Sequence, residues 1–300
     1  MAGTYFAALL ALASALCIAG GDVLQQRAAH GITDRSVGHV ALIAKLLRDP
    51  RWWWGALLLA ASIALQAAAL GRGSVLLVQA LLMLSLLFAL PINARVWRRK
   101  VTGGEWIWAG LLTAAVMVIV IVGNPQAGRS GASLGTWVAV VVVLAPLLVA
   151  CLVVGRIRGG ALAAALFAFV SGALWGVFAV LTKEVVARLG DGGWAVARTP
   201  EIYACILAAA GGVVWSQAAF QAGPLSASMP TLQVSQPVVA AVLGVVVLGE
   251  TLHTGRAGMY VLAAAGLAAT AAIVKLARVE AVTTRDGVQA RRQTSVDQPA

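Results

Sequence analysis

Nine stretches of mostly apolar residues dominate this sequence, and each is about as long as the roughly 20 residues that a helix needs to cross a bilayer. Hydrophobic residues make up 61% of the 300 residues and charged residues only 11%, whereas about a quarter of a soluble domain is charged. We therefore predict an all-α polytopic membrane protein, because lipid must cover the apolar surface that one core cannot bury. The expected spans are residues 4–28, 52–71, 74–96, 104–123, 134–154, 160–187, 200–221, 226–249 and 255–277.

Two further segments do not fit a simple span. Residues 37–47 are apolar but too short to cross the bilayer, so we expect an amphipathic helix in the membrane interface, with a further span as the alternative. Residues 278–300 are polar and basic, and we expect them to form a disordered cytoplasmic tail after a single transmembrane domain, residues 1–277.

The basic residues indicate how the chain lies in the membrane. The net charge of +11 comes from Lys and Arg in the loops and the tail, which is typical of membrane loops and argues against a nucleic-acid partner. With nine spans, sixteen of the 22 basic residues fall on one side and six on the other. Because basic loops stay inside, we expect a cytoplasmic C-terminus and an outside N-terminus, in the plasma or inner membrane of the cell.

The two halves of the chain share a series of short motifs in the same order. Gln66-Ala67-Ala68 with Gly71 and Ser74 precedes the third span, and Gln217-Ala218-Ala219 with Gly223 and Ser226 precedes the eighth. Spans one to four, residues 4–123, would thus match spans six to nine, residues 160–277, with the helix 134–154 joining them. Because equivalent helices are five spans apart, an odd number, they cross the membrane in opposite directions, and the second repeat is inverted relative to the first. Two inverted four-helix repeats are typical of secondary transporters, which bind substrate near the midplane between the repeats.

The same regions resemble a known transporter family. Ile18 to Arg27, and Ala69 to Ser74 followed by Val78-Gln79-Ala80, are similar to NIPA-type magnesium transporters. Ala222 to Ser228, with Leu248-Gly249-Glu250, resembles the wider drug/metabolite (EamA-like) transporter superfamily. The resemblance implies a nine- or ten-helix transporter of two inverted repeats, with Mg²⁺ or another cation as cargo. Relatives often have Gln-Pro where this chain has Gln79-Ala80, so no matching kink is expected in the third span.

Asp22 is the carboxylate in the first span, near its cytoplasmic end, and the one carboxylate that the sequence places well for a metal ion. Ionisable residues inside spans usually serve function, so a role in cation or proton coupling is one interpretation. The alternative is that Asp22 reaches interfacial water or pairs with a basic loop residue. Gln25 is a further candidate on the substrate path. When the two repeats are aligned, Gln25-Gln26 occupies the positions equivalent to Lys183-Glu184.

Two further charges within a span are Lys183 and Glu184, in the outer third of the sixth. Glu184 precedes Arg188 by four residues, the favoured order for an ion pair on a helix surface, and we expect that pair. We expect Lys183 to extend outward to the interface. Asp22 and Lys183 would then lie at opposite depths, guarding the inner and outer approaches.

The middle of the membrane is expected to be neutral but polar. Gln79 lies in the third span, and Gln233 and Gln236 lie three residues apart in the eighth. Pro230 and Pro237 each remove a backbone donor from the eighth span, so an interrupted helix with exposed carbonyls is expected there, as in many transporters. The alternative is that these glutamines form hydrogen bonds between helices.

Other polar or small positions are interpreted as structural. Glu105 lies at the very start of the fourth span and Glu250 precedes the ninth, where a carboxylate favours the positive end of a helix dipole. Gly71 and Gly223 belong to the repeated motif. The sequence has no HExxH or P-loop pattern, so neither an enzyme nor a cofactor is expected.

These features together predict a secondary transporter or facilitator of a small solute or ion that works by alternating access. The alternatives are a cation transporter or channel, with Mg²⁺ as one cargo, and a membrane scaffold or assembly factor that transports nothing. The expected partners are the lipid bilayer, the transported substrate and a second copy of the chain in a homodimer.

Overall fold

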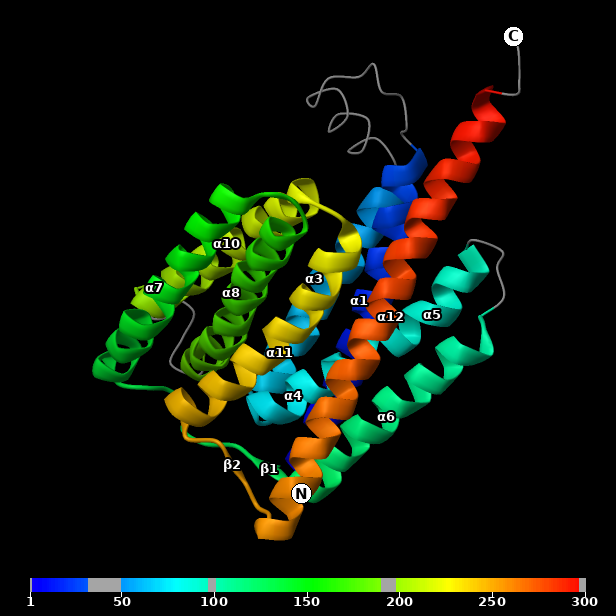
Figure 1. The fold of residues 1–300 in the computed structure, drawn as a ribbon. Helices are drawn as coiled ribbons and strands as arrows, with labels where there is room; N and C mark the ends of the chain where they lie inside the picture. Colours follow the sequence, from blue (N-terminus) through cyan, green and yellow to red (C-terminus); the bar gives the residue numbers. More distant parts are fainter. Residues whose placement is uncertain (1, 32–49, 97–100, 190–197, 297–300) are drawn as a thin grey trace.

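A computed structural model describes residues 2–31, 50–96, 101–189 and 198–296 (Figure 1). The expected interfacial segment 37–47 lies outside these residues. In the described part, nine helical segments are long and apolar enough to cross a bilayer, which confirms an all-helical, multi-pass membrane protein. The elements are α1 (Ala2–Gly31), α3 (Pro50–Leu70), α4 (Val75–Leu82), α5 (Ser85–Val96), α6 (Gly103–Gly123), β1 (Pro125–Gln126), α7 (Leu134–Arg158), α8 (Gly160–Arg188), α10 (Pro200–Ala222), α11 (Leu225–Leu248), β2 (Thr251–Leu252) and α12 (Arg256–Val296).

The surface of the bundle is strongly apolar, as a lipid environment requires. On α7, the side chains of Val142 and Val143 are 65% and 73% exposed. α7 lies at one edge of the bundle and packs against α8 (Figure 1). Exposed apolar patches on soluble proteins rarely exceed a few hundred Å², so an apolar helix at the edge of the bundle indicates contact with lipid.

The helices pack closely both within each half of the chain and between the halves that precede and follow α7. α1 packs along α3, α8 packs along both α10 and α11, and α6 packs along α12. α4 contacts α11, which joins the first part of the chain to the second. β1 and β2 form a short antiparallel pair in which Pro125 is opposite Leu252. We call the end of the bundle at which these strands pair the strand end.

The helix of the third span is interrupted, whereas the helix of the eighth span is continuous. This is the opposite of what was expected, because Pro230 and Pro237 predicted an interruption in the eighth span and no kink was expected in the third. The third span ends as α4 at Leu82 and resumes as α5 at Ser85. Between them the N–H of Leu84 donates to the carbonyl of Leu81, a tighter turn than an α-helix makes. α11 instead runs unbroken through Pro230 and Pro237. Proline is tolerated within membrane helices where neighbouring helices accommodate the local distortion.

Small residues allow this close support of α11. An added Cβ on Gly176 would lie 2.9 Å from the amide nitrogen of Ala240 and 3.0 Å from the carbonyl of Gln236, and one on Gly172 would meet the hydroxyl of Ser235. The backbones of α8 and α11 therefore lie almost in contact beside Pro237, as small residues permit in membrane helices.

The last helix extends beyond the expected final span. α12 continues to Val296 and projects past the rest of the bundle (Figure 1), so most of the tail that was expected to be disordered is helical. Residues 278–296 contain no proline and include four Arg, two Ala, two Gln and one Glu, residue types that favour helix.

Candidate functional site

Lys183 and Glu250 form a buried ion pair at the strand end. The Nζ atom of Lys183 lies 2.6 Å from Oε1 of Glu250, and these residues are only 6% and 1% exposed. Lys183 therefore does not extend outward, and the expectation that it reaches the interface was wrong. A buried ammonium needs a counter-charge, and Glu250 supplies one within reach of α8.

The Glu250 carboxylate also binds the start of α4. The N–H of Val75 donates to Oε1 at 2.6 Å, and the N–H of Leu76 donates to Oε2 at 3.0 Å. Ser74 caps the same helix, because its hydroxyl accepts a hydrogen bond from the N–H of Leu77. Glu250 was expected to favour the dipole of the ninth span, but it acts on the N-terminus of α4 instead. It lies just past the end of α11, and α12 begins later, at Arg256.

Glu184 holds the loop between β1 and α7 rather than pairing along its own helix. It accepts hydrogen bonds from the N–H of Ala132 at 2.9 Å and from the indole N–H of Trp137 at 3.2 Å. Arg188 bonds to Glu201 of α10 at 2.7 Å. The expected pair between Glu184 and Arg188 was therefore wrong. Glu184 is 1% exposed, so it lies inside the bundle while Arg188 reaches toward the surface.

A cavity of about 310 Å³ lies away from the strand end, among α1, α5, α8, α10 and α11. We call it the Asp22 cavity, because Asp22 lines it together with Gln233, Ser85 and Trp175. Ala7 of α1 lies beside Gly73 at the strand end. Asp22 follows fifteen residues later, about 22 Å along the helix. The cavity and the Lys183–Glu250 pair are thus at different depths.

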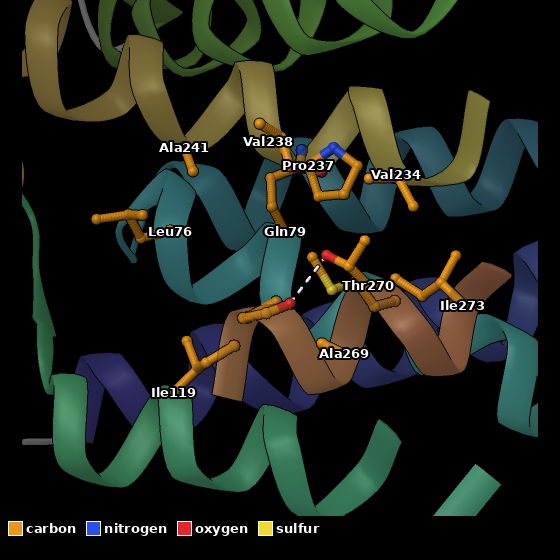
Figure 2. A pocket seen from close by; sticks show the side chains of 13 residues that line it. Leu76, Gln79, Ile119, Val234, Pro237, Val238, Ala241, Ala269, Thr270 and Ile273 are labelled. Carbon is orange, nitrogen blue, oxygen red and sulfur yellow. Dashed lines mark hydrogen bonds between the residues drawn. The ribbon is translucent and has the colours of Figure 1, made fainter. Parts of the chain in front are cut away.

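A second, smaller cavity of about 140 Å³ lies among α4, α6, α11 and α12. Gln79 and Pro237 line it, and Figure 2 shows the amide end of Gln79 beside the ring of Pro237. Gln79 is 3% exposed, and its Nε2 has no hydrogen-bond partner among the described residues. Thr270, also in the lining, donates its hydroxyl proton to the carbonyl of Gly266. We call this the Gln79 cavity.

The candidate site residues of α11 therefore do not share one cavity. Gln233 lines the Asp22 cavity and Pro237 lines the Gln79 cavity. Gln236 and Pro230 line neither of them, and the backbone of Gln236 lies against Gly172 and Gly176 of α8. The side chain of Gln25 lies outside the described part of α1.

The remaining motif residues have clear local contacts. Glu105 and Thr102 form a reciprocal cap at the start of α6, with the N–H of Thr102 donating to Oε2 of Glu105 at 2.7 Å. An added Cβ on Gly71 would lie 2.7 Å from a methyl of Val186. One on Gly223 would lie 2.6 Å from the carbonyl of Gly160. Both glycines therefore permit close approach to α8.

The structure adds cavity residues that sequence reasoning missed. Trp175, Phe220 and Met229 line the Asp22 cavity, but in sequence each sits in an apolar span where an aromatic or thioether side chain is common. Ser85 was also missed, because the break that places it in the cavity is not visible in the apolar pattern of residues 74–96. A tryptophan in mid-span, away from the interfacial belts, was the available signal.

Comparisons with known proteins identify one relative. The chain is 34% identical over 251 residues to an uncharacterized protein of Corynebacterium glutamicum, an alignment that covers 83% of this chain and 87% of that protein. No family model matches the chain, and no solved structure matches it.

Proposed function

We propose that this chain, which belongs to the same family as the uncharacterized protein of Corynebacterium glutamicum, is a secondary transporter or facilitator that moves a small solute or ion by alternating access. The observation that carries the proposal is the Asp22 cavity. Helices from both sides of α7 line it, and it holds a carboxylate and a glutamine within the spans. Intramembrane ionisable groups commonly mark the path of a substrate or ion.

Helix packing supports two repeats around that cavity. α1 packs along α3 as α8 packs along α10, which are the corresponding helices of the two proposed repeats. α4 contacts α11, and α6 packs along α12, so corresponding helices also meet each other. This is the arrangement expected of two copies related by an axis between them. It agrees with the proposed resemblance to the drug/metabolite transporter superfamily.

The distribution of basic residues places the strand end outside the cell in this proposal. The Lys183–Glu250 pair and the β1–β2 pairing then join α4, α8 and the loops after α6 and α11 on the outer side. The Asp22 cavity lies toward the cytoplasmic side. The structure would thus represent an inward-facing state, and the outward-facing state would require Glu250 to leave Lys183, α4 or both.

Flux into proteoliposomes tests the transport proposal. Purified protein should accelerate uptake of at least one member of a panel of small cations, anions and neutral solutes. Asp22→Asn and Gln233→Ala should reduce that uptake several-fold while the protein stays folded. Gln217→Ala, an exposed position on α10 outside both cavity linings, is the matched control. A protein that carries no solute but purifies with a partner would instead be a scaffold or assembly factor.

Cysteine labelling tests the orientation and the state. After Cys17, Cys151 and Cys205 are replaced by alanine, Ser85→Cys in the cavity should react with a membrane-impermeant maleimide from the cytoplasmic side. Gln126→Cys, which is exposed on β1, should react from the outside. Labelling of Ser85→Cys from the outside alone would contradict the inward-facing assignment. Reporter fusions after residue 100 and at the C-terminus should both report the cytoplasm.

The described donors do not favour Mg²⁺ as the cargo. Mg²⁺ prefers an octahedral set of oxygen ligands and keeps several waters. Within the described ranges, no three His, Cys, Asp or Glu side chains are grouped closely enough to hold a metal ion. The Asp22 cavity offers one carboxylate amid aromatic and aliphatic side chains, a lining that suits a different kind of cation.

A further inference from the structure

The lining of the Asp22 cavity combines one negative charge with aromatic and polarisable surfaces. Of the described residues that line it, Asp22 alone is charged. Trp175 and Phe220 supply aromatic rings, and Met229 supplies a thioether. The volume of about 310 Å³ falls at the lower end of the roughly 300–1,000 Å³ that small-molecule sites occupy. The cavity is therefore large for a bare metal ion and of suitable size for a small organic molecule.

Contacts with Gly212 and Phe178 hold the side chain of Trp175 in place. Its indole lies against Gly212 of α10, where an added Cβ would come within 2.9 Å of the indole nitrogen. The hydroxyl of Ser171, one turn earlier on α8, donates to the carbonyl of Gly212 at 2.7 Å and fixes α8 against α10 at this level. The ring of Phe178 meets Trp175 edge to face at 5.4 Å. A ring positioned in this way presents a preorganised surface to the cavity.

Such a lining suits an organic cation better than the alternatives. A cation is attracted to the face of an aromatic ring, and tryptophan attracts it most strongly. A substituted ammonium group carries apolar substituents that can contact Phe220, Leu232 and Met229, whereas a hydrated metal ion would face these surfaces with its water shell. An organic anion would place its charge beside the exposed Asp22 carboxylate, and the two like charges would repel each other.

We infer that the Asp22 cavity binds a small organic cation of the substituted-ammonium class, with its charge at Asp22 and its apolar part against Trp175 and Phe220. This inference rests on the proposed transport function and specifies its substrate class. Asp22 already takes part in an interaction within the protein, so the cation binds by exchange with that interaction. Gln233 and Ser85, the other polar lining residues on α11 and α5, contribute hydrogen-bonding groups beside the charge.

Equilibrium dialysis of the purified full-length protein with labelled benzyltrimethylammonium tests this inference. Phenylmethanesulfonate, an anion of similar size and shape, and Mg²⁺ are the comparison probes. The wild-type protein should bind the cation and bind the sulfonate at least about tenfold more weakly, since a charge reversal near one carboxylate is worth more than the 1.4 kcal/mol of a tenfold change.

Variants locate the binding. Asp22→Asn should weaken cation binding at least about tenfold, and Asp22→Glu should retain most of it. Trp175→Ala should weaken it several-fold and Trp175→Phe less, because phenylalanine keeps an aromatic face. Gly212→Ala, which displaces the indole from α10, should weaken binding in the same direction as Trp175→Ala. Trp106→Phe, at a 52% exposed position on α6, is the control and should leave binding unchanged.

The outcomes separate this inference from the transport proposal. Equal or tighter binding of the sulfonate, no binding of benzyltrimethylammonium to folded protein, or an unchanged affinity in Asp22→Asn would each overturn the organic-cation assignment. If flux of another solute still depends on Asp22 and Gln233, the transport proposal stands and only the substrate class is wrong. If no solute crosses, the transport proposal itself fails.

Discussion

Lys183 and Glu250 are 67 positions apart in the chain, yet their side chains meet at 2.6 Å inside the bundle. The same carboxylate accepts two N–H groups at the start of α4. One side chain therefore joins three parts of the chain, α4, α8 and the turn after α11, at a single buried point. Because charge-assisted hydrogen bonds are stronger than neutral ones, any movement that separates these three parts must replace those bonds.

Breaking this pair by replacing one partner should strongly destabilise the protein. Glu250→Gln leaves the Lys183 ammonium buried without its counter-charge, which costs about 3–5 kcal/mol. The double variant Lys183→Met, Glu250→Gln should lose much less than the sum of the two single changes, because no buried charge remains and the new amide oxygen can still accept from α4. The free energy of unfolding, measured by SDS titration in mixed micelles, checks this double-mutant cycle. Additive single effects would show that the pair does not form in solution.

Double-mutant cycles can also identify the partner of Arg188, and here the expected coupling energies are small. Arg188 and Glu201 should show a coupling energy of about 0.5 kcal/mol, because the Arg188 side chain is 40% exposed and solvent screens the pair. Arg188 and Glu184 should show coupling near zero. The same unfolding measurement on Arg188→Gln, Glu201→Gln and Glu184→Gln, singly and in pairs, distinguishes the two. Coupling larger for Glu184 than for Glu201 would restore the intrahelical pair expected from the sequence.

Close packing of α8 on α11 makes Gly176 intolerant of a side chain. Gly176→Ala should destabilise the protein by about 1–3 kcal/mol, since the new methyl group would meet backbone atoms of α11 that cannot move independently. Gly110→Ala on α6 is the matched control, because an added Cβ there meets nothing within 4 Å. That control should be neutral or slightly stabilising, as alanine favours helix. Thermal midpoints in one detergent compare the two, and equal midpoints would contradict the packing of α8 on α11.

The buried amide of Gln79 should carry a cost to stability. Gln79→Met keeps the length of the side chain and removes a donor that has no partner among the described residues, so it should stabilise the fold by about 1 kcal/mol. Gln79→Glu should destabilise it, because a carboxylate would be buried in a mostly apolar cavity. Thermal midpoints of both variants check the sign. A loss of stability in Gln79→Met would show that the amide is hydrogen-bonded in solution.

Much of the architecture could be predicted because it depends on local composition. The lengths of the apolar stretches predicted the nine helices of the described residues that are long and apolar enough to cross a bilayer, since each backbone polar group in lipid must be satisfied within its own helix. The cap at the start of α6 follows equally from its neighbours, with Thr102 and Glu105 three residues apart. The prolines misled where composition alone was used, because α8 supports α11 closely enough for the helix to continue through Pro237.

The sequence by itself therefore determined the apolar character of the helices, the nine long apolar segments among the described residues and the presence of a few costly polar groups within them. Only the tertiary structure decided which groups meet. In the folded protein Lys183 is buried and forms an ion pair with Glu250. Glu184 accepts a hydrogen bond from Trp137 instead of pairing with Arg188. Asp22, Trp175 and Gln233 line one cavity. A buried charge accepts whichever partner the packing of distant helices brings within about 3 Å, and that distance is set by contacts far apart in the chain.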